Sequence, residues 1–307
     1  MNRRTPASTT RARSAWAILC LLAAVSGAAF VAACGGSGGG SSPTAAATVA
    51  ATATPAASPS SPSPSASPAA ATTTLSLYFL RGEELGVAER QARQTTMPAT
   101  AALEALLAGP TAAESAAGLA SAVPGGTRLL GLSIDGTTAL VDLSARFAAG
   151  GGSLSMQARV AQIVYTLTRF KTVETVTFML EGSAIDTLGG EGLLLGEGQR
   201  RSAWRSFEPA IFVESPGVGA VLGSPFVLEG TASVFEGSFR AQLEDAGGEI
   251  ASATIQASRG APERGRFRTT ISFSATAPSG ALVVYSPSME DGSRQGEVRI
   301  PVGFSSD

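Results

Sequence analysis

The segment Leu154–Phe170, LSMQARVAQIVYTLTRF, decides the fold of the first globular region of this chain. Its apolar side chains recur at alternating spacings of four and three residues: Met156, Val160, Ile163, Leu167 and Phe170. This spacing predicts an α-helix with one apolar stripe. Four polar residues fall away from the stripe: Arg159, Gln162, Thr166 and Arg169.

Shorter elements precede this helix. The stretch Leu75–Leu80, LSLYFL, predicts a strand. Pro98 opens a helix, because the N–H that proline lacks is unpaired in a first helical turn anyway, and Gly109-Pro110 end it. Thr111 with Glu114 matches a capping box for a further short helical turn.

A hairpin and a closing strand complete the first region. Thr127–Ile134 and Thr137–Leu143 flank Asp135-Gly136, a pair that favours a two-residue hairpin turn because it accepts positive φ. Apolar residues alternate again over Val176–Leu180. The order β-α-β-β-α-β predicts an α+β domain over residues 75–208, with its helices on one face of a mostly antiparallel sheet.

The same residues resemble a known family. The stretches that carry the resemblance are Tyr78-Phe79, Leu103–Pro110 (LEALLAGP), Ser121–Thr127 (SAVPGGT), Val141–Ser144 (VDLS) and Gln162–Thr168 (QIVYTLT). Together they look like the GerMN domain of sporulation and spore germination proteins. The resemblance implies an extracytoplasmic module, related to ring-building domains of envelope assemblies, with no established enzymatic activity.

Residues 209–307 contain short alternating strands separated by turns such as Gly247-Gly248 and Asp291-Gly292. This pattern predicts an all-β immunoglobulin-like sandwich of about seven strands, without the Cys…Trp…Cys pattern of antibody domains. Ser224–Ala232 (SPFVLEGTA), Val234–Gly237 (VFEG) and Gly265–Phe267 resemble the immunoglobulin-like domain of bacterial spore germination. That family often follows GerMN, and the resemblance implies a binding or spacing role without naming a ligand.

The N-terminal residues predict a lipoprotein signal peptide over residues 1–33. Arginines at positions 3, 4, 11 and 13 precede the uncharged run 15–33, which ends in small residues before Cys34. We expect cleavage before Cys34, a diacylglycerol on its sulfur, and a mature protein on the outer face of a bacterial membrane. An uncleaved membrane-spanning helix is the alternative, since the run approaches the ~20 residues that cross a bilayer. Gly27 and the small residues weaken that alternative, and Cys20 is read as an apolar filler.

Residues 34–74 predict a disordered tether behind the lipidated Cys34. From Gly35 to Thr74 the chain has no charged and no aromatic residue, and apart from Val49 it contains only Ser, Pro, Ala, Thr and Gly. Such a segment cannot bury enough apolar surface to offset the entropy of ordering it. Fully extended, it reaches on the order of 120 Å, which lifts a globular head off the membrane.

Composition excludes several classes of function. The chain has no histidine and two cysteines, one of them inside the signal. Zinc sites of Cys and His, Ser-His-Asp triads and Cys-His pairs are therefore excluded, and no P-loop or dinucleotide motif occurs. We predict no metal and no small-molecule cofactor. Removing the four leader arginines from 22 Lys+Arg leaves 18 against 24 Asp+Glu, about −6, which argues against a nucleic-acid partner.

Three carboxylates are candidate acid/base groups. Glu104 reads instead as a solvated helix residue, Asp142 as a strand-end residue and Glu181 as part of a turn, so we predict no catalytic residue. Two further carboxylate pairs, Asp245 with Glu249 and Glu290 with Asp291, lack calcium-loop spacing and read as hairpin turns.

The aromatic candidates are also open to two interpretations. Phe235-Glu236-Gly237 is either an exposed binding loop or, as favoured here, a turn whose phenylalanine enters the core. Trp204 and Phe207 either stack on a sugar or partner, or, as favoured, join the two domains.

The sequence thus predicts a non-catalytic surface lipoprotein that serves as a protein-interaction or assembly module of the envelope, with a link to sporulation or spore germination implied by the resemblance. A module that binds peptidoglycan or wall polysaccharide is the alternative. The expected partners are the membrane, through Cys34, and an envelope protein or cell-wall glycan.

Overall fold

The computed structural model describes residues 71–190, 192–196 and 198–305, which lie in one compact unit. The predicted signal peptide, Cys34 and the tether up to residue 70 lie outside the described residues. The first strand begins at Thr72, so the end of the segment assigned to the tether already belongs to a strand.

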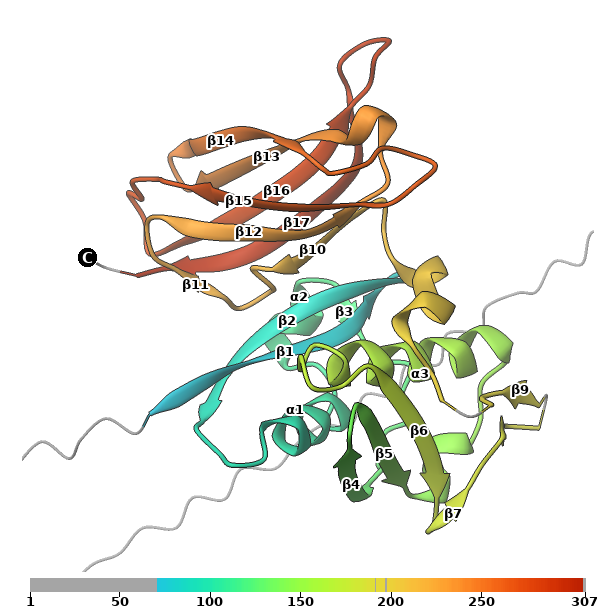
Figure 1. The fold of residues 1–307 in the computed structure, drawn as a ribbon. Coiled ribbons are helices and arrows are strands. Elements are labelled where there is room, and N and C mark those ends of the chain that lie inside the picture. The colour runs from blue at the N-terminus through green and yellow to red at the C-terminus, as the bar shows by residue number, and fades with distance from the viewer. Residues whose placement is uncertain (1–70, 191, 197, 306–307) are drawn as a thin grey trace, which may run out of the picture. The chain divides into compact units, whose positions relative to one another are not determined.

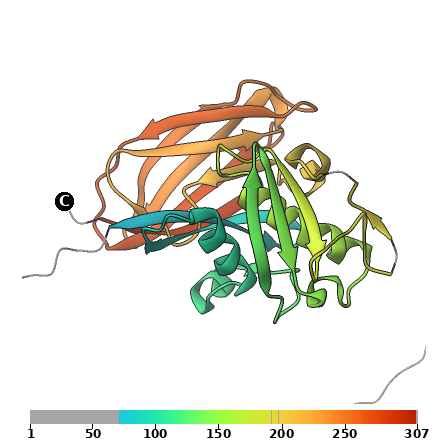
Figure 2. The ribbon, with the colours of Figure 1, turned by 60° about the horizontal axis from the view of Figure 1, so that its bottom comes forward.

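The first region contains two main sheets and three α-helices (Figures 1 and 2). One sheet has the antiparallel order β2-β1-β3, formed by β1 (Thr72–Arg81), β2 (Glu84–Arg93) and β3 (Leu119–Ala120). The other has the order β4-β5-β6-β7, formed by β4 (Leu129–Asp135), β5 (Thr138–Leu143), β6 (Thr175–Leu180) and β7 (Ser183–Ala184). A small pair, β8 (Thr187–Leu188) with β9 (Leu193–Leu194), follows.

The helices lie where the sequence patterns put them. They are α1 (Pro98–Leu107), α2 (Ala112–Ala116) and α3 (Ser153–Leu167), with 3-10 turns η1 (Ala145–Ala148) and η2 (Arg201–Phe207). Pro98 stands at the start of α1, and the capping box of α2 is formed by Thr111 and Glu114. The α+β class is therefore confirmed.

Two features of this region were not anticipated. Strand β2 was missed, because its sequence ELGVAERQAR carries four charged residues and little alternation. The strands also divide between two sheets, and β5 pairs in parallel with β6 through the crossover helix α3. A parallel pair requires such a crossover, since a hairpin can join only antiparallel strands.

Helix α3 is covered on several sides, since it contacts β1, α1, η2 and β6. Three of the four polar residues that fall away from its apolar stripe are consequently buried: Arg159, Gln162 and Thr166 are at most 2% exposed, while Arg169 lies beyond the helix end and is partly exposed. Periodicity identified the stripe correctly but could not show that the opposite side of the helix is also covered. A buried polar group must find a hydrogen-bond partner, and each of these does.

Two of these residues complete the open edge of β1. Strand β3 pairs only with Leu80 and Arg81, which leaves the backbone of Tyr78 without a strand partner on that side. The backbone N–H of Tyr78 donates to Thr166 Oγ1 at 3.1 Å, and its carbonyl accepts from Gln162 Nε2 at 3.2 Å. Helix α3 thus takes the place of a neighbouring strand.

Arg159 holds the loop that precedes α3. Its guanidinium donates to the carbonyl oxygens of Phe147 (2.6 Å), Ala149 (3.2 Å) and Gly150 (3.0 Å). These carbonyls belong to η1 and to the glycine turn after it. The buried charge therefore serves as the hydrogen-bonding core of that loop.

The second region is a β-sandwich, as predicted. A sheet of order β10-β12-β15 contains β10 (Ile211–Ser215), β12 (Phe226–Ala232) and β15 (Gly265–Ile271). It faces a sheet of order β11-β17-β16-β13-β14, with β11 (Val221–Leu222), β13 (Ser238–Asp245), β14 (Gly248–Gln256), β16 (Ser279–Pro287) and β17 (Arg294–Phe304) (Figure 1). The turn η3 (Phe235–Gly237) leads into β13.

The two regions share backbone hydrogen bonds and one apolar core. Val218 donates to the carbonyl of Val87 and accepts from the N–H of Glu89, both at 2.8 Å, in a parallel bridge to β2. A side chain at Gly217 would place its Cβ 2.9 Å from the Val87 carbonyl oxygen, so glycine permits this approach. Aromatic rings from both regions also pack together here. The ring centroid of Phe212 in β10 lies 6.0 Å from the ring centroids of Tyr78 and Tyr165.

Replacing Arg159 by leucine is expected to lower the free energy of unfolding by roughly 2–4 kcal/mol, because several buried carbonyl groups lose their donor. The exposed Arg93, replaced by leucine as a control, should change it by less than about 0.5 kcal/mol. Urea unfolding followed by circular dichroism measures both. Equal stability of the Arg159→Leu and Arg93→Leu variants would contradict the assigned role.

Candidate functional site

A cleft of about 780 Å³ lies between the C-terminal end of α3, the turn η2 and the outer face of sheet β10-β12-β15. Seven cationic side chains and three carboxylates line it, the latter being Glu208, Glu214 and Glu229. Each carboxylate is bound by arginine. The site is therefore built from three ion-pair groups.

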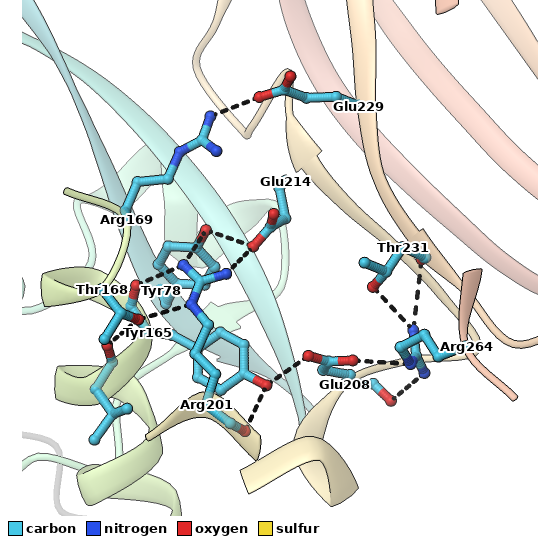
Figure 3. Close-up of polar contacts among 11 residues, drawn as sticks. Tyr78, Tyr165, Thr168, Arg169, Arg201, Glu208, Glu214, Glu229, Thr231 and Arg264 are labelled. Carbon is cyan, nitrogen blue, oxygen red and sulfur yellow. Dashed lines mark hydrogen bonds and ion pairs between the residues drawn. The ribbon is translucent and has the colours of Figure 1, made fainter. Parts of the chain in front are cut away.

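Arg201, at the start of η2, is the centre of the first group (Figure 3). Its guanidinium donates to Glu214, to Thr168 Oγ1 at 2.7 Å and to the Tyr165 carbonyl at 3.0 Å. The guanidinium also donates to the hydroxyl oxygen of Tyr78 at 3.2 Å, and that hydroxyl donates to Glu214 at 2.9 Å. The guanidinium also lies over both tyrosine rings, 5.1 and 4.7 Å from their centroids.

The pKa shifts in this group show which protonation states Tyr78 and Arg201 keep. Burial raises the pKa of Tyr78, against the opposing charge of Arg201. Burial alone lowers the pKa of Arg201, but the charges and hydrogen bonds of Tyr78 and Glu214 outweigh it and raise that pKa. Both groups therefore keep one protonation state throughout the physiological pH range.

The second group joins Tyr165, Glu208 and Arg264. The hydroxyl of Tyr165 donates to Glu208 at 2.5 Å, and burial, followed by this hydrogen bond, raises the pKa of Tyr165. Arg264 forms an ion pair with Glu208 at 2.8 Å and donates to the Pro209 carbonyl at 2.8 Å. Helix α3 is thereby linked to the turn before β15.

Glu229 of β12 is the centre of the third group. It accepts from Arg169, just beyond α3, at 2.9 Å and from Arg268 of β15. Burial alone would raise the pKa of Glu229, but the hydrogen bond and charge of Arg169, with those of Arg268, outweigh it and lower that pKa. Glu229 is thus an ionised bridge between the two regions.

This arrangement is suited to holding charge in place, and it does not resemble an acid/base site. A general acid or base requires a group whose pKa lies near the working pH. Here the tyrosine pKa values rise and that of Glu229 falls, so each shifted group moves away from neutrality. Among the described residues, no group of three or more potential His, Cys, Asp or Glu metal ligands occurs.

The carboxylates weighed from the sequence have structural roles or face solvent. Glu104 is exposed on α1. Asp142 accepts from the N–H of Gly182 at 3.0 Å, and Glu181 accepts from the N–H of Ala145 at 2.9 Å. Asp142 and Glu181 therefore hold together the turns at the ends of β5 and β6, as the structural interpretation proposed.

The pairs considered for calcium lie in turns, also as expected. Asp245 accepts from the N–H groups of Gly247 (2.7 Å) and Thr276 (2.9 Å), while Glu249 accepts from Gln242 (2.8 Å). Asp291 accepts from the N–H of Ser293 at 3.0 Å in the hairpin after β16. The two aspartates thus accept backbone N–H groups, while Glu249 accepts from a side-chain amide.

The favoured interpretation of Phe235 is wrong, because its side chain is 64% exposed. The preceding residue, Val234, occupies the core position at 6% exposure. Glu236 and Gly237 have φ values of 53° and 70°, and Gly237 packs against the backbone of Arg259. This tight turn excludes the phenylalanine from the interior.

Trp204 and Phe207 are buried, at 6% and 3% exposure, with ring centroids 6.4 Å apart. Both belong to the apolar core that continues from the first region into the second. They are therefore not available to stack on a sugar, and the interpretation as a junction between the domains is the one that fits.

The residues of the cleft were not identified from the sequence. Tyr78 and Tyr165, which contact the cleft residue Arg201, are separated by 87 positions and read as apolar residues of a strand and a helix. One signal was available: Arg264, Arg266 and Arg268 recur at every second position, which on a strand gives one charged face. The acidic partners Glu208, Glu214 and Glu229 have no comparable spacing.

Replacing Arg201 by alanine is expected to lower the free energy of unfolding by about 2–4 kcal/mol, since Glu214 and the buried Tyr78 hydroxyl lose a partly buried partner. Arg200 provides the control, because its ion pair with Glu174 is 58% and 59% exposed. Arg200→Ala should cost less than about 1 kcal/mol. Chemical denaturation distinguishes the two, and similar losses for both variants would contradict a central role for Arg201.

Acid is expected to weaken the bridge at Glu229. Because the folded-state pKa of Glu229 is lowered, its contribution is complete above the unfolded carboxyl pKa of about 4.3 and is lost as the pH falls through the folded value. Glu229→Gln should flatten the fall of stability between about pH 5 and pH 3. Urea midpoints across that range measure it. Glu174→Gln, an exposed control, should keep the parent profile.

Comparisons with known proteins agree with this architecture. Residues 76–186 match the Germane family, described as sporulation and spore germination, and residues 210–293 match Gmad2, the immunoglobulin-like domain of bacterial spore germination. No curated protein sequence matches the chain.

Two solved structures from Bacillus subtilis are similar. The tandem GerMN domains of the sporulation protein GerM share 17% identity at a TM-score of 0.39, over 60% of this chain and 60% of that one. The first GerMN domain of GerM shares 20% identity at a TM-score of 0.36, over 43% of this chain and 99% of that one. By the two family models, residues 76–186 form a GerMN-like domain of the Germane family and residues 210–293 an immunoglobulin-like domain of bacterial spore germination.

Proposed function

We propose that this chain is a lipid-anchored, non-catalytic module of the bacterial envelope that acts by binding and positioning, in a process of sporulation or spore germination. Both matched families are described by that process. The anchor is the diacylglycerol expected at Cys34, and the tether behind it carries the two domains away from the membrane. In the described part of the chain, no helix is long and apolar enough to span a bilayer.

The observation that carries the non-catalytic part of this proposal is the use of the cleft carboxylates. Glu208, Glu214 and Glu229 each lie in an ion pair that links different elements. In a catalytic pair, by contrast, different environments give the two carboxyl groups different pKa values, so that one is protonated and the other ionised at the working pH. The ion pairs join the two regions and present a fixed surface.

A specific observation also favours the second candidate, a module that binds wall polymer. The cleft has seven cationic side chains against three carboxylates, although the mature chain is acidic. A surface of this kind attracts anionic ligands. An assembly role with an envelope protein and a wall-binding role are both compatible with the anchor, and the ligand distinguishes them.

The anchor is tested by metabolic labelling with a fatty acid. The parent chain and the Cys20→Ala variant are expected to incorporate the label, because Cys20 lies in the segment that is removed. Cys34→Ala should incorporate none, since the only thiol that follows the cleavage site is lost. Label in the Cys34→Ala chain, or its absence from the parent, would refute the anchor.

Catalysis is tested separately with the full-length chain in non-ionic detergent, incubated with isolated cell wall. No soluble glycan fragment should be released above a buffer control. Fragment release that disappears on changing Glu104, Asp142 or Glu181 would overturn the non-catalytic proposal.

A further inference from the structure

The cleft concentrates positive charge on a protein whose mature chain is acidic. Seven of its 18 mature lysine and arginine residues line this one cavity, while only three of 24 acidic residues do. The cavity therefore has an excess of four positive charges. Folding gathers the positive charges from three separate segments of the chain, after α3, in η2 and at β15 with its flanking residue Arg264.

Structural ion pairs account for only part of this charge. Arg201, Arg264, Arg169 and Arg268 bind the three carboxylates. Lys171, Arg205 and Arg266 line the same cavity, are exposed, and make no side-chain hydrogen bond or ion pair with any described residue. These three side chains therefore do not stabilise the fold through any hydrogen bond or ion pair with a described residue.

The cationic side chains of β15 form a regular row. Arg266 and Arg268 lie at alternate positions on the outer face of the strand, opposite Thr231 and Glu229 of β12. Alternate residues of a strand are about 7 Å apart along its axis. Such a row matches a ligand that carries anionic groups at regular intervals better than it matches a single ion.

The size of the cavity agrees with a polymer segment. A volume of about 780 Å³ lies in the range of sites that bury ligands with many atoms, and it greatly exceeds that of one phosphate ion. The only aromatic residue that lines the cavity is Phe267, which is 4% exposed. Single-stranded nucleic acids are usually held by exposed aromatic rings on which bases stack, and none lines this cleft.

We propose that the cleft binds an extended anionic polymer of the cell envelope through its repeated phosphate or carboxylate groups. Lys171, Arg205 and Arg266 make the direct contacts, while the paired arginines keep the cavity open and positive. The inference deepens the proposed function, because it names the ligand class of a binding module that performs no chemistry. Guanidinium groups bind both oxyanions through paired hydrogen bonds, so phosphate and carboxylate polymers share this recognition.

The test measures binding of fluorescent polymers to the full-length chain in non-ionic detergent at about 50 mM salt. The probes are long-chain polyphosphate, polygalacturonate, neutral dextran and single-stranded poly-dT. At least one of the two anionic polymers should bind and dextran should not, and the tighter of the two identifies the anionic group. Binding should weaken several-fold at about 300 mM salt, where charges are screened over shorter distances.

Two charge-matched double variants locate the site. Arg205→Gln/Arg266→Gln should weaken binding at least about tenfold, because it removes two unpaired charges from the cleft. Arg93→Gln/Arg128→Gln removes two exposed arginines that do not line the cleft and should change Kd less than about twofold. All four residues are exposed, so both variants are expected to unfold at the parent's urea midpoint.

Three outcomes would overturn the proposal: no binding of either anionic polymer, equal loss in the two double variants, or tighter binding of poly-dT than of both. The last would identify a nucleic-acid ligand instead. None of these results changes the fatty-acid labelling or the wall-release experiment, so failure of the ligand assignment is distinguishable from failure of the proposed function.

Discussion

The contact of Arg201 with Tyr78, Tyr165 and Glu214 is the interaction on which the two-domain arrangement depends. One guanidinium touches strand β1, helix α3 and strand β10, and it lies over two tyrosine rings whose other neighbour is Phe212. A charge buried among aromatic rings is costly unless every donor is used. Because Arg201 uses its donors on groups from both regions, any displacement of one region against the other would leave buried polar groups unpaired.

Helix α3 provides the second constraint, since polar side chains on its buried side replace missing backbone partners. Gln162 and Thr166 complete the hydrogen bonds of Tyr78, and Arg159 holds the loop before the helix. The same helix ends at Leu167, and Thr168 and Arg169 directly after it line the cleft. The position of α3 in the first region thus determines where Arg169 lies in the cleft.

The cleft combines structural and unpaired charge in one place. Its three carboxylates form ion pairs with arginines. Lys171, Arg205 and Arg266 line the same cleft without such a partner among the described residues. Charged residues without a partner seldom contribute to stability, and a group of them in one cavity is better explained by a ligand. A protein anchored as proposed, with a cleft of this charge, would hold an anionic neighbour near the membrane.

Local pattern was sufficient for much of the fold. The stripe of α3, the capping box at Thr111, the Asp135-Gly136 hairpin and the alternating strands of the sandwich follow from periodicity and turn chemistry, which act within a few residues. The same local reasoning excludes histidine-based chemistry, and it predicts the lipid signal, which lies outside the described residues. It missed β2 and placed Phe235 in the core, because neither alternation nor hydrophobicity reports what lies on the other side of an element. Only the tertiary structure decided that Arg159, Gln162 and Thr166 are buried, and that Arg169, Arg201, Glu214 and Arg266 share one cleft. The physical reason is that ion pairs and cavities join residues far apart in the chain, and no spacing in the sequence encodes those contacts.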